Sequence, residues 1–161
     1  MLELLENLEE IIIGELESNR IIKGIDIPLL LNELKRILKR INLYVWCNKE
    51  QIYNYLSYFK SDNFDLLTWH KTNPIPTCCN KYLSDTEYLL FFRQKDVKIF
   101  GSYETKRKYY VTPINKKDKD LWKHPTIKPL HIIKNLIINS SKEGDTVLDC
   151  FMRKRNNRSC L

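Results

Sequence analysis

Two short, uninterrupted apolar runs constrain the fold of this chain more than any other feature of its sequence. They are Leu43–Cys47 (LYVWC) and the stretch YLLFF within the expected strand Glu87–Phe92 (EYLLFF), and both are rich in aromatic and aliphatic residues. Runs of this length and composition are typical of strands that are buried on both faces. Phe64–Trp69 and Thr146–Asp149 (TVLD) are expected to form two further strands.

Helical patterns alternate with these runs. Asp26 followed by Pro28 predicts a helix start, and Asn48 can cap a second helix before the strand at Phe64–Trp69. A third helix is expected over Thr126–Ser141, opened by proline and ended near Gly144. Because strands and helices alternate, the sequence predicts an α/β fold with a mostly parallel sheet. A length of 161 residues fits one domain.

The charge of the chain is unevenly distributed. Residues 1–17 carry six glutamates and no Lys or Arg, with apolar residues at the helical spacing of Leu5, Leu8, Ile12 and Leu16. Residues 93–128 carry eleven Lys or Arg against four Asp or Glu, with aromatic residues between them. This pattern suits either a surface that binds a polyanion or an ordinary solvated face. Tyr109 and Tyr110, in contrast, are expected to be buried on a strand.

Several classes of protein are disfavoured. The five cysteines are odd in number and form no C-x-x-C pair, so we expect neither a disulfide framework nor a metal site. No apolar run approaches the roughly 18 residues that span a bilayer. The acidic N-terminus does not resemble a signal peptide, so the expected location is cytoplasmic.

Three motifs follow one another in an informative order. Trp69–Pro76 (WHKTNPIP) precedes Tyr82–Tyr88 (YLSDTEY), and the third motif joins 124–129 (HPTIKP) through a helix to 144–151 (GDTVLDCF). This order resembles the β-group DNA amino-methyltransferases, which carry His-Pro-Thr-x-Lys-Pro, a helix and then Gly-Asp-x-Val-Leu-Asp-Pro-Phe. The resemblance covers roughly residues 20–152.

The resemblance implies a fold, a reaction and a set of residues. The fold is an incomplete Rossmann-like methyltransferase fold, and the reaction is methyl transfer from S-adenosylmethionine to the exocyclic amine of adenine (N6) or cytosine (N4) in double-stranded DNA, without a metal. A strand that ends in Asp-x-Phe delivers a turn at the carboxyl edge of the sheet, where such cofactors bind. The implied cofactor-binding residues are Thr126, Lys128, Asp149 and Phe151. On spacing alone, Thr126 could instead cap a helix and Lys128 could be a solvated cation.

The implied DNA surface falls on residues 94–123, in the place of a recognition insert. Its candidate phosphate contacts are Lys106, Arg107, Lys108, Lys116, Lys117 and Lys123.

The chain departs from the family at a glycine-rich loop. Family members continue with Gly-Ser-Gly-Thr-Thr after the phenylalanine, whereas residues 152–161 read MRKRNNRSCL. One permitted coding of these ten residues, with a single base deleted behind the Met152 codon, translates as Met-Gly-Ser-Gly-Thr-Thr-Gly-Val-Ala. We interpret residues 152–161 as an out-of-frame tail, with a basic nucleic-acid-binding tail as the alternative. Without the loop, this chain is expected to bind the cofactor poorly.

The catalytic motif of the family is also missing. These enzymes grip a flipped base with Asp/Asn/Ser-Pro-Pro-Tyr/Phe, and no Pro-Pro pair occurs in the sequence. We therefore assign no catalytic residue and expect a single partial methyltransferase domain over residues 1–161, with residues 1–19 as an acidic helix and no activity of its own. The alternatives are a DNA-binding remnant, a methyltransferase for RNA or small molecules, and the product of a decayed gene. A complementary fragment and a homo-oligomer both remain open, as does the choice between adenine and cytosine.

Overall fold

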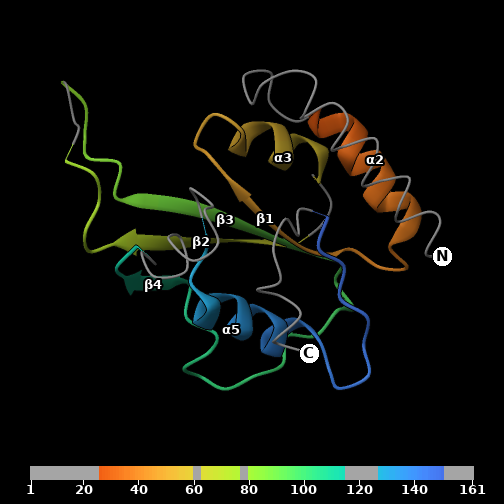
Figure 1. The fold of residues 1–161 in the computed structure, drawn as a ribbon. Coiled ribbons are helices and arrows are strands. Elements are labelled where there is room, and N and C mark those ends of the chain that lie inside the picture. The colour runs from red at the N-terminus through yellow and green to blue at the C-terminus, as the bar shows by residue number, and fades with distance from the viewer. Residues whose placement is uncertain (1–25, 60–62, 77–79, 115–126, 151–161) are drawn as a thin grey trace.

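The structure is a computed structural model that describes residues 26–59, 63–76, 80–114 and 127–150. Its elements are α2 (Ile27–Ile37), β1 (Asn42–Cys47), α3 (Ile52–Tyr58), β2 (Asn63–Lys71), β3 (Thr86–Arg93), β4 (Tyr109–Thr112) and α5 (Leu130–Ser140). The four strands form one sheet, with α2 and α3 on one side of it and α5 on the other (Figure 1). This layering confirms the expected α/β class.

The sheet is mixed rather than mostly parallel, which corrects the expected strand directions. The strand order is β1-β3-β2-β4. β3 runs antiparallel to both β1 and β2, and β4 runs parallel to β2. Three strands therefore share one direction, but β3 lies between two of them. The reason is that the described residues between β2 and β3 (72–76 and 80–85) hold no crossover helix, and a connection of this kind returns the chain antiparallel.

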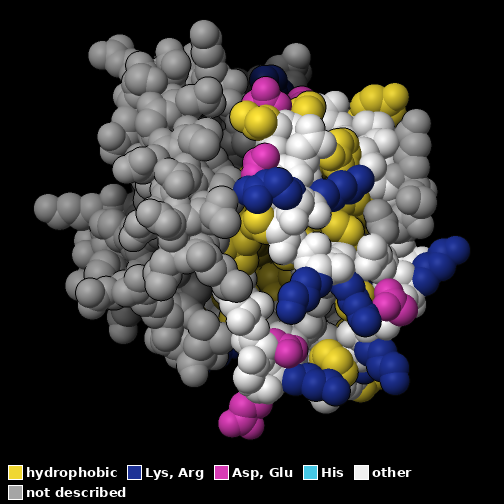
Figure 2. Space-filling model, turned by 90° about the vertical axis from the view of Figure 1, so that its right-hand side faces the viewer, with side chains coloured by type: hydrophobic (Ala, Val, Ile, Leu, Met, Phe, Trp, Pro, Cys, Tyr) yellow, Lys and Arg dark blue, Asp and Glu magenta, His cyan; other side chains and the backbone are white. Residues whose placement is uncertain are grey.

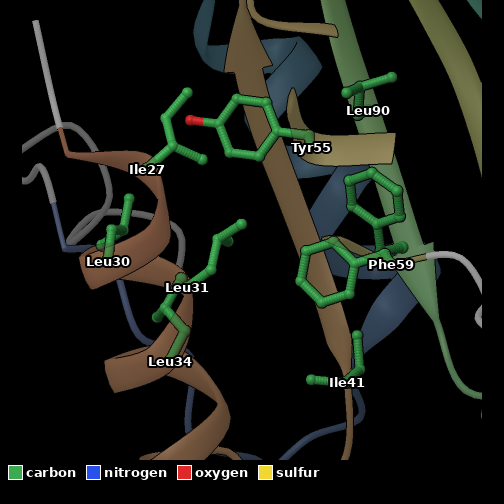
Figure 3. Packing of buried hydrophobic residues seen from close by; sticks show 9 residues of the cluster. Ile27, Leu30, Leu31, Leu34, Ile41, Tyr55, Phe59 and Leu90 are labelled. Atoms are coloured by element: carbon green, nitrogen blue, oxygen red, sulfur yellow. The ribbon is translucent and has the colours of Figure 1, made fainter. Parts of the chain in front are cut away.

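The first core layer packs α2 and α3 against β1 and β3. The Asp26 carboxylate caps α2 by accepting a hydrogen bond of 2.9 Å from the Leu29 amide, with Pro28 in the first turn, as the sequence predicts. Leu31 is fully buried, and the Phe59 ring stacks on Phe92 with centroids 4.4 Å apart. Figure 3 shows this cluster, whose buried members are Ile27, Leu30, Leu31, Leu34, Ile41, Tyr55, Phe59, Leu90 and Phe92.

The second core layer packs α5 against the opposite face of the sheet. α5 begins at Leu130, directly after Pro129, so the predicted helix is confirmed with a later start. The buried members of this layer are Leu67, Trp69, Leu89, Phe91, Tyr110, Ile132 and Leu136. Tyr110 is 7% exposed and Tyr109 is 52% exposed, so the expected burial is confirmed only for Tyr110.

The predicted strand at Thr146–Asp149 does not form. The segment is described but lies outside the sheet, and Val147 and Leu148 are 39% and 36% exposed. A strand needs a hydrogen-bonded neighbour, and among the described strands β1 pairs only with β3. Without a neighbouring strand, residues 146–149 cannot form the backbone hydrogen bonds of a sheet.

The two edges of the described sheet differ in character. β1 has six residues without a charge or a proline, and all of them are half-buried. β4 has four residues and follows a basic turn that ends at Lys108. Within the described part of the chain, no helix is long and apolar enough to cross a membrane.

Candidate functional site

The carboxyl ends of β1, β2 and β4 lie at the same edge of the sheet. Because β1, β2 and β4 share a direction, their last residues lie at the same edge as the first residues of β3. The register confirms this, since Cys47 is paired with Tyr88, Trp69 with Glu87 and Lys71 with Thr112. We call this the carboxyl edge.

A carboxylate between two lysines is the main electrostatic feature of the carboxyl edge. Lys71, the last residue of β2, places its Nζ 2.8 Å from Oε1 of Glu87 in β3. Lys128, just before α5, donates a hydrogen bond to Oε2 of the same carboxylate. The side chain of Lys71 is only 15% exposed, that of Glu87 25% and that of Lys128 24%. Two cations therefore share one anion in a site that is largely withdrawn from water.

The pKa of Glu87 reflects this competition. Burial on its own raises the pKa of a carboxyl group, because a low dielectric disfavours the charged form. Here the charge and the hydrogen bond of Lys128, followed by those of Lys71, outweigh burial and hold the pKa of Glu87 below its ordinary value. The carboxylate is therefore ionised at neutral pH and keeps both ammonium groups in place.

Two tryptophans support the lysines. The Nζ atom of Lys128 lies 4.8 Å from the centroid of the Trp46 ring and 5.9 Å from that of Trp69. The two indoles meet edge to face, with centroids 6.2 Å apart. The indole N–H of Trp69 donates to Oγ1 of Thr112 at 2.8 Å, which fixes the ring. Cation–π attraction over indole faces adds to the ion pairs in holding Lys128.

A second feature is the basic turn between β3 and β4, which is anchored to α5. Asn139, a buried polar residue of α5, donates from its side-chain amide to the Thr105 carbonyl at 2.7 Å and accepts from the Thr105 hydroxyl at 2.7 Å. Gly101 has a positive φ of 76°, and a Cβ atom there would collide with the Asn139 side chain. The turn is thus held in one conformation against the helix.

The comparisons with known proteins agree on one family. A family model described as DNA methylase matches residues 27–152, which is well over half of the chain. The chain belongs to the DNA methylase family. The type II methyltransferase M2.LlaDCHI of Lactococcus lactis subsp. cremoris is 31% identical over 140 residues, covering 74% of this chain and 51% of that protein. M2.DpnII of Streptococcus pneumoniae is 33% identical over 143 residues, covering 73% and 50%.

The chain spans about half the length of the curated relatives it matches. Among solved structures, a chain in the crystal structure of the M1.HpyAVI-SAM complex aligns with a TM-score of 0.57 at 20% identity, over 76% of this chain and 64% of that one. At this identity the likeness concerns the fold, and it confirms the partial Rossmann-like methyltransferase fold expected from the sequence.

The structure describes only two of the four predicted cofactor-binding residues. Lys128 lies at the carboxyl edge, and Asp149 is half-buried at the end of the irregular segment that follows α5. Its neighbour Cys150 packs against the core formed by α2 and α3. Burial and then the Asp149 carboxylate raise the pKa of the Cys150 thiol to about 11. Thr126 and Phe151 lie outside the described residues.

The structure likewise describes only three of the six predicted DNA contacts. Lys106, Arg107 and Lys108 are exposed in the anchored turn, whereas Lys116, Lys117 and Lys123 lie outside the described residues. Arg107 Nε is 2.9 Å from Oε2 of Glu104, and Lys108 pairs with Asp65 of β2. Two of the three described cations therefore already have a carboxylate partner within the chain.

The family motifs did not assign a role to Glu87 or Lys71. Both lie within the matched motifs, but the register of β2 with β3 brings Lys71 beside Glu87, and the packing of α5 on the sheet brings Lys128 to the same carboxylate. A Lys at the end of one strand and a Glu at the start of the next is the only sequence signal for the pair. Within the described residues, no group of three or more His, Cys, Asp or Glu is arranged to hold a metal ion.

Proposed function

We propose that this chain is a segment of an S-adenosylmethionine-dependent DNA methyltransferase that modifies the exocyclic amine of adenine or cytosine. The observation that carries the proposal is the position of Lys128. It lies at the carboxyl edge, in the stretch matched by the DNA methylase family, and is held there by Glu87. Ligands of open α/β sheets bind outside this edge.

The described residues fit one end of the cofactor. Lys71 and Lys128 oppose the single carboxylate of Glu87, so these three side chains together carry one net positive charge, which would attract the carboxylate of an amino-acid group. In this role Lys128 binds the amino-acid end, with Asp149 and, by resemblance, Thr126 and Phe151 as its companions. The bound cofactor supplies the methyl group, while these side chains hold and orient it.

We also propose that this chain does not transfer methyl groups by itself. The sequence contains neither a Pro-Pro pair to grip a flipped base nor glycines after Phe151 to approach the cofactor. The purified chain, labelled S-adenosylmethionine and duplex DNA should give no label above that of a Lys128→Met control. Transfer that exceeds this control would disprove the proposed inactivity.

The out-of-frame origin of residues 152–161 has a direct test. The coding DNA should be sequenced through codons 150–161 and for a few hundred bases on each side. Gly-Ser-Gly-Thr-Thr in the next frame, together with an upstream Asp-Pro-Pro-Tyr, is the expected result. If neither is present, the frameshift account is wrong.

The second candidate is a DNA-binding remnant without catalysis. It is favoured by the exposure of Lys106, Arg107 and Lys108 on one anchored turn. Fluorescence anisotropy with a duplex should then detect binding that weakens with salt and does not respond to the cofactor. Changing the three residues to Gln should reduce the salt dependence, while Lys134→Gln on α5 should not. Binding that is unaffected by the triple change would exclude this surface.

A further inference from the structure

The turn between β3 and β4 presents two tyrosine rings to solvent. Tyr103 is 82% exposed, and Tyr109, the first residue of β4, is 52% exposed. The turn is fixed at both ends, because the Asn139 side chain holds it against α5 and the Thr68 amide of β2 donates to the Lys108 carbonyl at 2.8 Å. The two rings are therefore held at defined positions on the surface.

Arg107 joins the two rings. Its guanidinium carbon lies 5.7 Å from the centroid of the Tyr103 ring, and its Nη1 donates to the Tyr109 hydroxyl at 3.1 Å. The other two nitrogens donate to the Glu104 carboxylate, Nε to Oε2 at 2.9 Å and Nη2 to Oε1 at 3.2 Å. Each nitrogen of the guanidinium is thus engaged within the turn, and Glu104 balances its charge. Arg107 therefore orients the rings and is not a free cation.

Positive charge by itself does not distinguish this turn from the rest of the surface. Figure 2 shows Lys and Arg side chains gathered on one face of the molecule. Exposed cations also lie at and directly after the end of α2: Lys35, Arg36, Lys39 and Arg40. The turn differs from them because it sets an exposed ring beside an oriented guanidinium. Next to this pair is Lys106, which is exposed and has no carboxylate partner among the described residues.

An exposed aromatic ring beside a guanidinium plane is a surface on which nucleobases stack. Stacking needs a base with an uncovered face, and a base inside a duplex lacks one because its neighbours cover both faces. The Lys106 ammonium group can bind a phosphate next to the stacked base. The chemistry of the turn therefore favours an unpaired nucleotide over a paired one.

We propose that Tyr103 stacks on an unpaired base of bound DNA, with Arg107 as the residue that positions the ring and Lys106 as the contact to the adjacent phosphate. This role rests on the proposed function, because it takes DNA as the ligand. DNA that is held for methylation of an exocyclic amine offers such a base, since the removal of one base from the stack leaves its partner unpaired.

Fluorescence anisotropy of the full chain with two labelled duplexes tests the role of the ring. One duplex is fully paired, and the other has the same sequence with one extra, unpaired adenine. The wild type should bind the bulged duplex more tightly. Tyr103→Ala should weaken that binding by at least about fivefold, the loss of one stacked base, and leave binding to the paired duplex unchanged. Tyr53→Ala, at a 77% exposed position of α3, is the matched control and should change neither.

The other outcomes separate this role from DNA binding as such. If Tyr103→Ala weakens both duplexes equally, the ring contacts the DNA backbone and the proposal is wrong. If it weakens neither, while Lys106→Gln weakens both, DNA is bound at the turn without stacking and only the role of Tyr103 fails. If the wild type binds neither duplex, the role of Tyr103 and DNA binding by this chain fail together.

Arg107→Lys tests the positioning role. Lysine keeps the positive charge but lacks the planar fork that reaches both Glu104 and Tyr109. The variant should lose the preference for the bulged duplex and keep the salt dependence of the wild type. If the preference persists, Arg107 does not position the ring.

Discussion

Replacing Glu87 by Gln isolates the charge at the carboxyl edge, because the two side chains have nearly the same shape. Glu87 makes two charge-assisted hydrogen bonds, one with Lys71 and one with Lys128. Each such bond contributes about 1.5–3 kcal/mol. The amide oxygen of Gln still accepts one bond, and the lysines retain some access to water, which reduces the loss. We expect Glu87→Gln to lower the free energy of unfolding by about 2 kcal/mol.

Urea unfolding followed by tryptophan fluorescence is a suitable assay, because Trp46 and Trp69 lie at the site. The control is Glu33→Gln, which removes an exposed ion pair with Arg36 and should cost less than about 0.5 kcal/mol. If Glu87→Gln costs no more than this control, the two-lysine arrangement does not stabilise the fold and the reasoning fails.

The pH dependence of this difference has a defined sign. The pKa of Glu87 is lowered in the folded chain, so its stabilising contribution is complete above the unfolded pKa of about 4.3. It is lost as the pH falls through the folded pKa. The gap in stability between the wild type and Glu87→Gln should therefore be constant from about pH 6 to 8 and should narrow progressively as the pH falls below the unfolded pKa. A gap that stays open in acid would contradict the assignment.

Two further predictions concern the core and the anchored turn. Leu31→Ala should cost about 2–5 kcal/mol in urea unfolding because Leu31 is fully buried, whereas Leu83→Ala at an exposed loop position should cost under about 1 kcal/mol. Gly101→Ala should lower the Tm more than Gly144→Ala, measured by circular dichroism. Both glycines have positive φ, but only a Cβ at Gly101 meets other atoms, among them the side chain of Asn139. Equal shifts would mean that the turn yields to the added methyl group.

Local patterns in the sequence predicted most of the elements. The runs at Leu43–Cys47 and Glu87–Phe92 became β1 and β3, since they are short and rich in aromatic or β-branched residues, which favour strands over helices. The start of α2 followed from Asp26 and Pro28, whose capping chemistry is local. These successes need only information from neighbouring residues.

The order and direction of the strands could not be predicted in this way. A run of apolar residues can form a strand in a parallel or an antiparallel sheet. The residues of β3 therefore do not indicate that this strand lies between β1 and β2. The strand expected at Thr146–Asp149 failed for a related reason, because a strand depends on a neighbour that its own residues do not specify.

The site was predicted in part. Lys128 came from a motif, but its partner Glu87 lies 41 positions earlier in the sequence. The two residues meet because α5 packs against the face of the sheet near the first residues of β3. The sequence shows that Lys71, Glu87 and Lys128 are charged, but the distances between them depend on the tertiary fold.

The central place of β3 also determines when a sheet can exist during synthesis. β1 and β2 emerge first, but they are not adjacent and have no hydrogen bonds with each other. A nascent chain that ends before Thr86 therefore contains β1 and β2 but lacks β3, the strand that pairs with both of them. Once Arg93 has emerged, β1 and β2 gain their shared neighbour together. Pulse proteolysis of stalled ribosome complexes should detect protection that appears abruptly with β3, rather than stepwise with each strand.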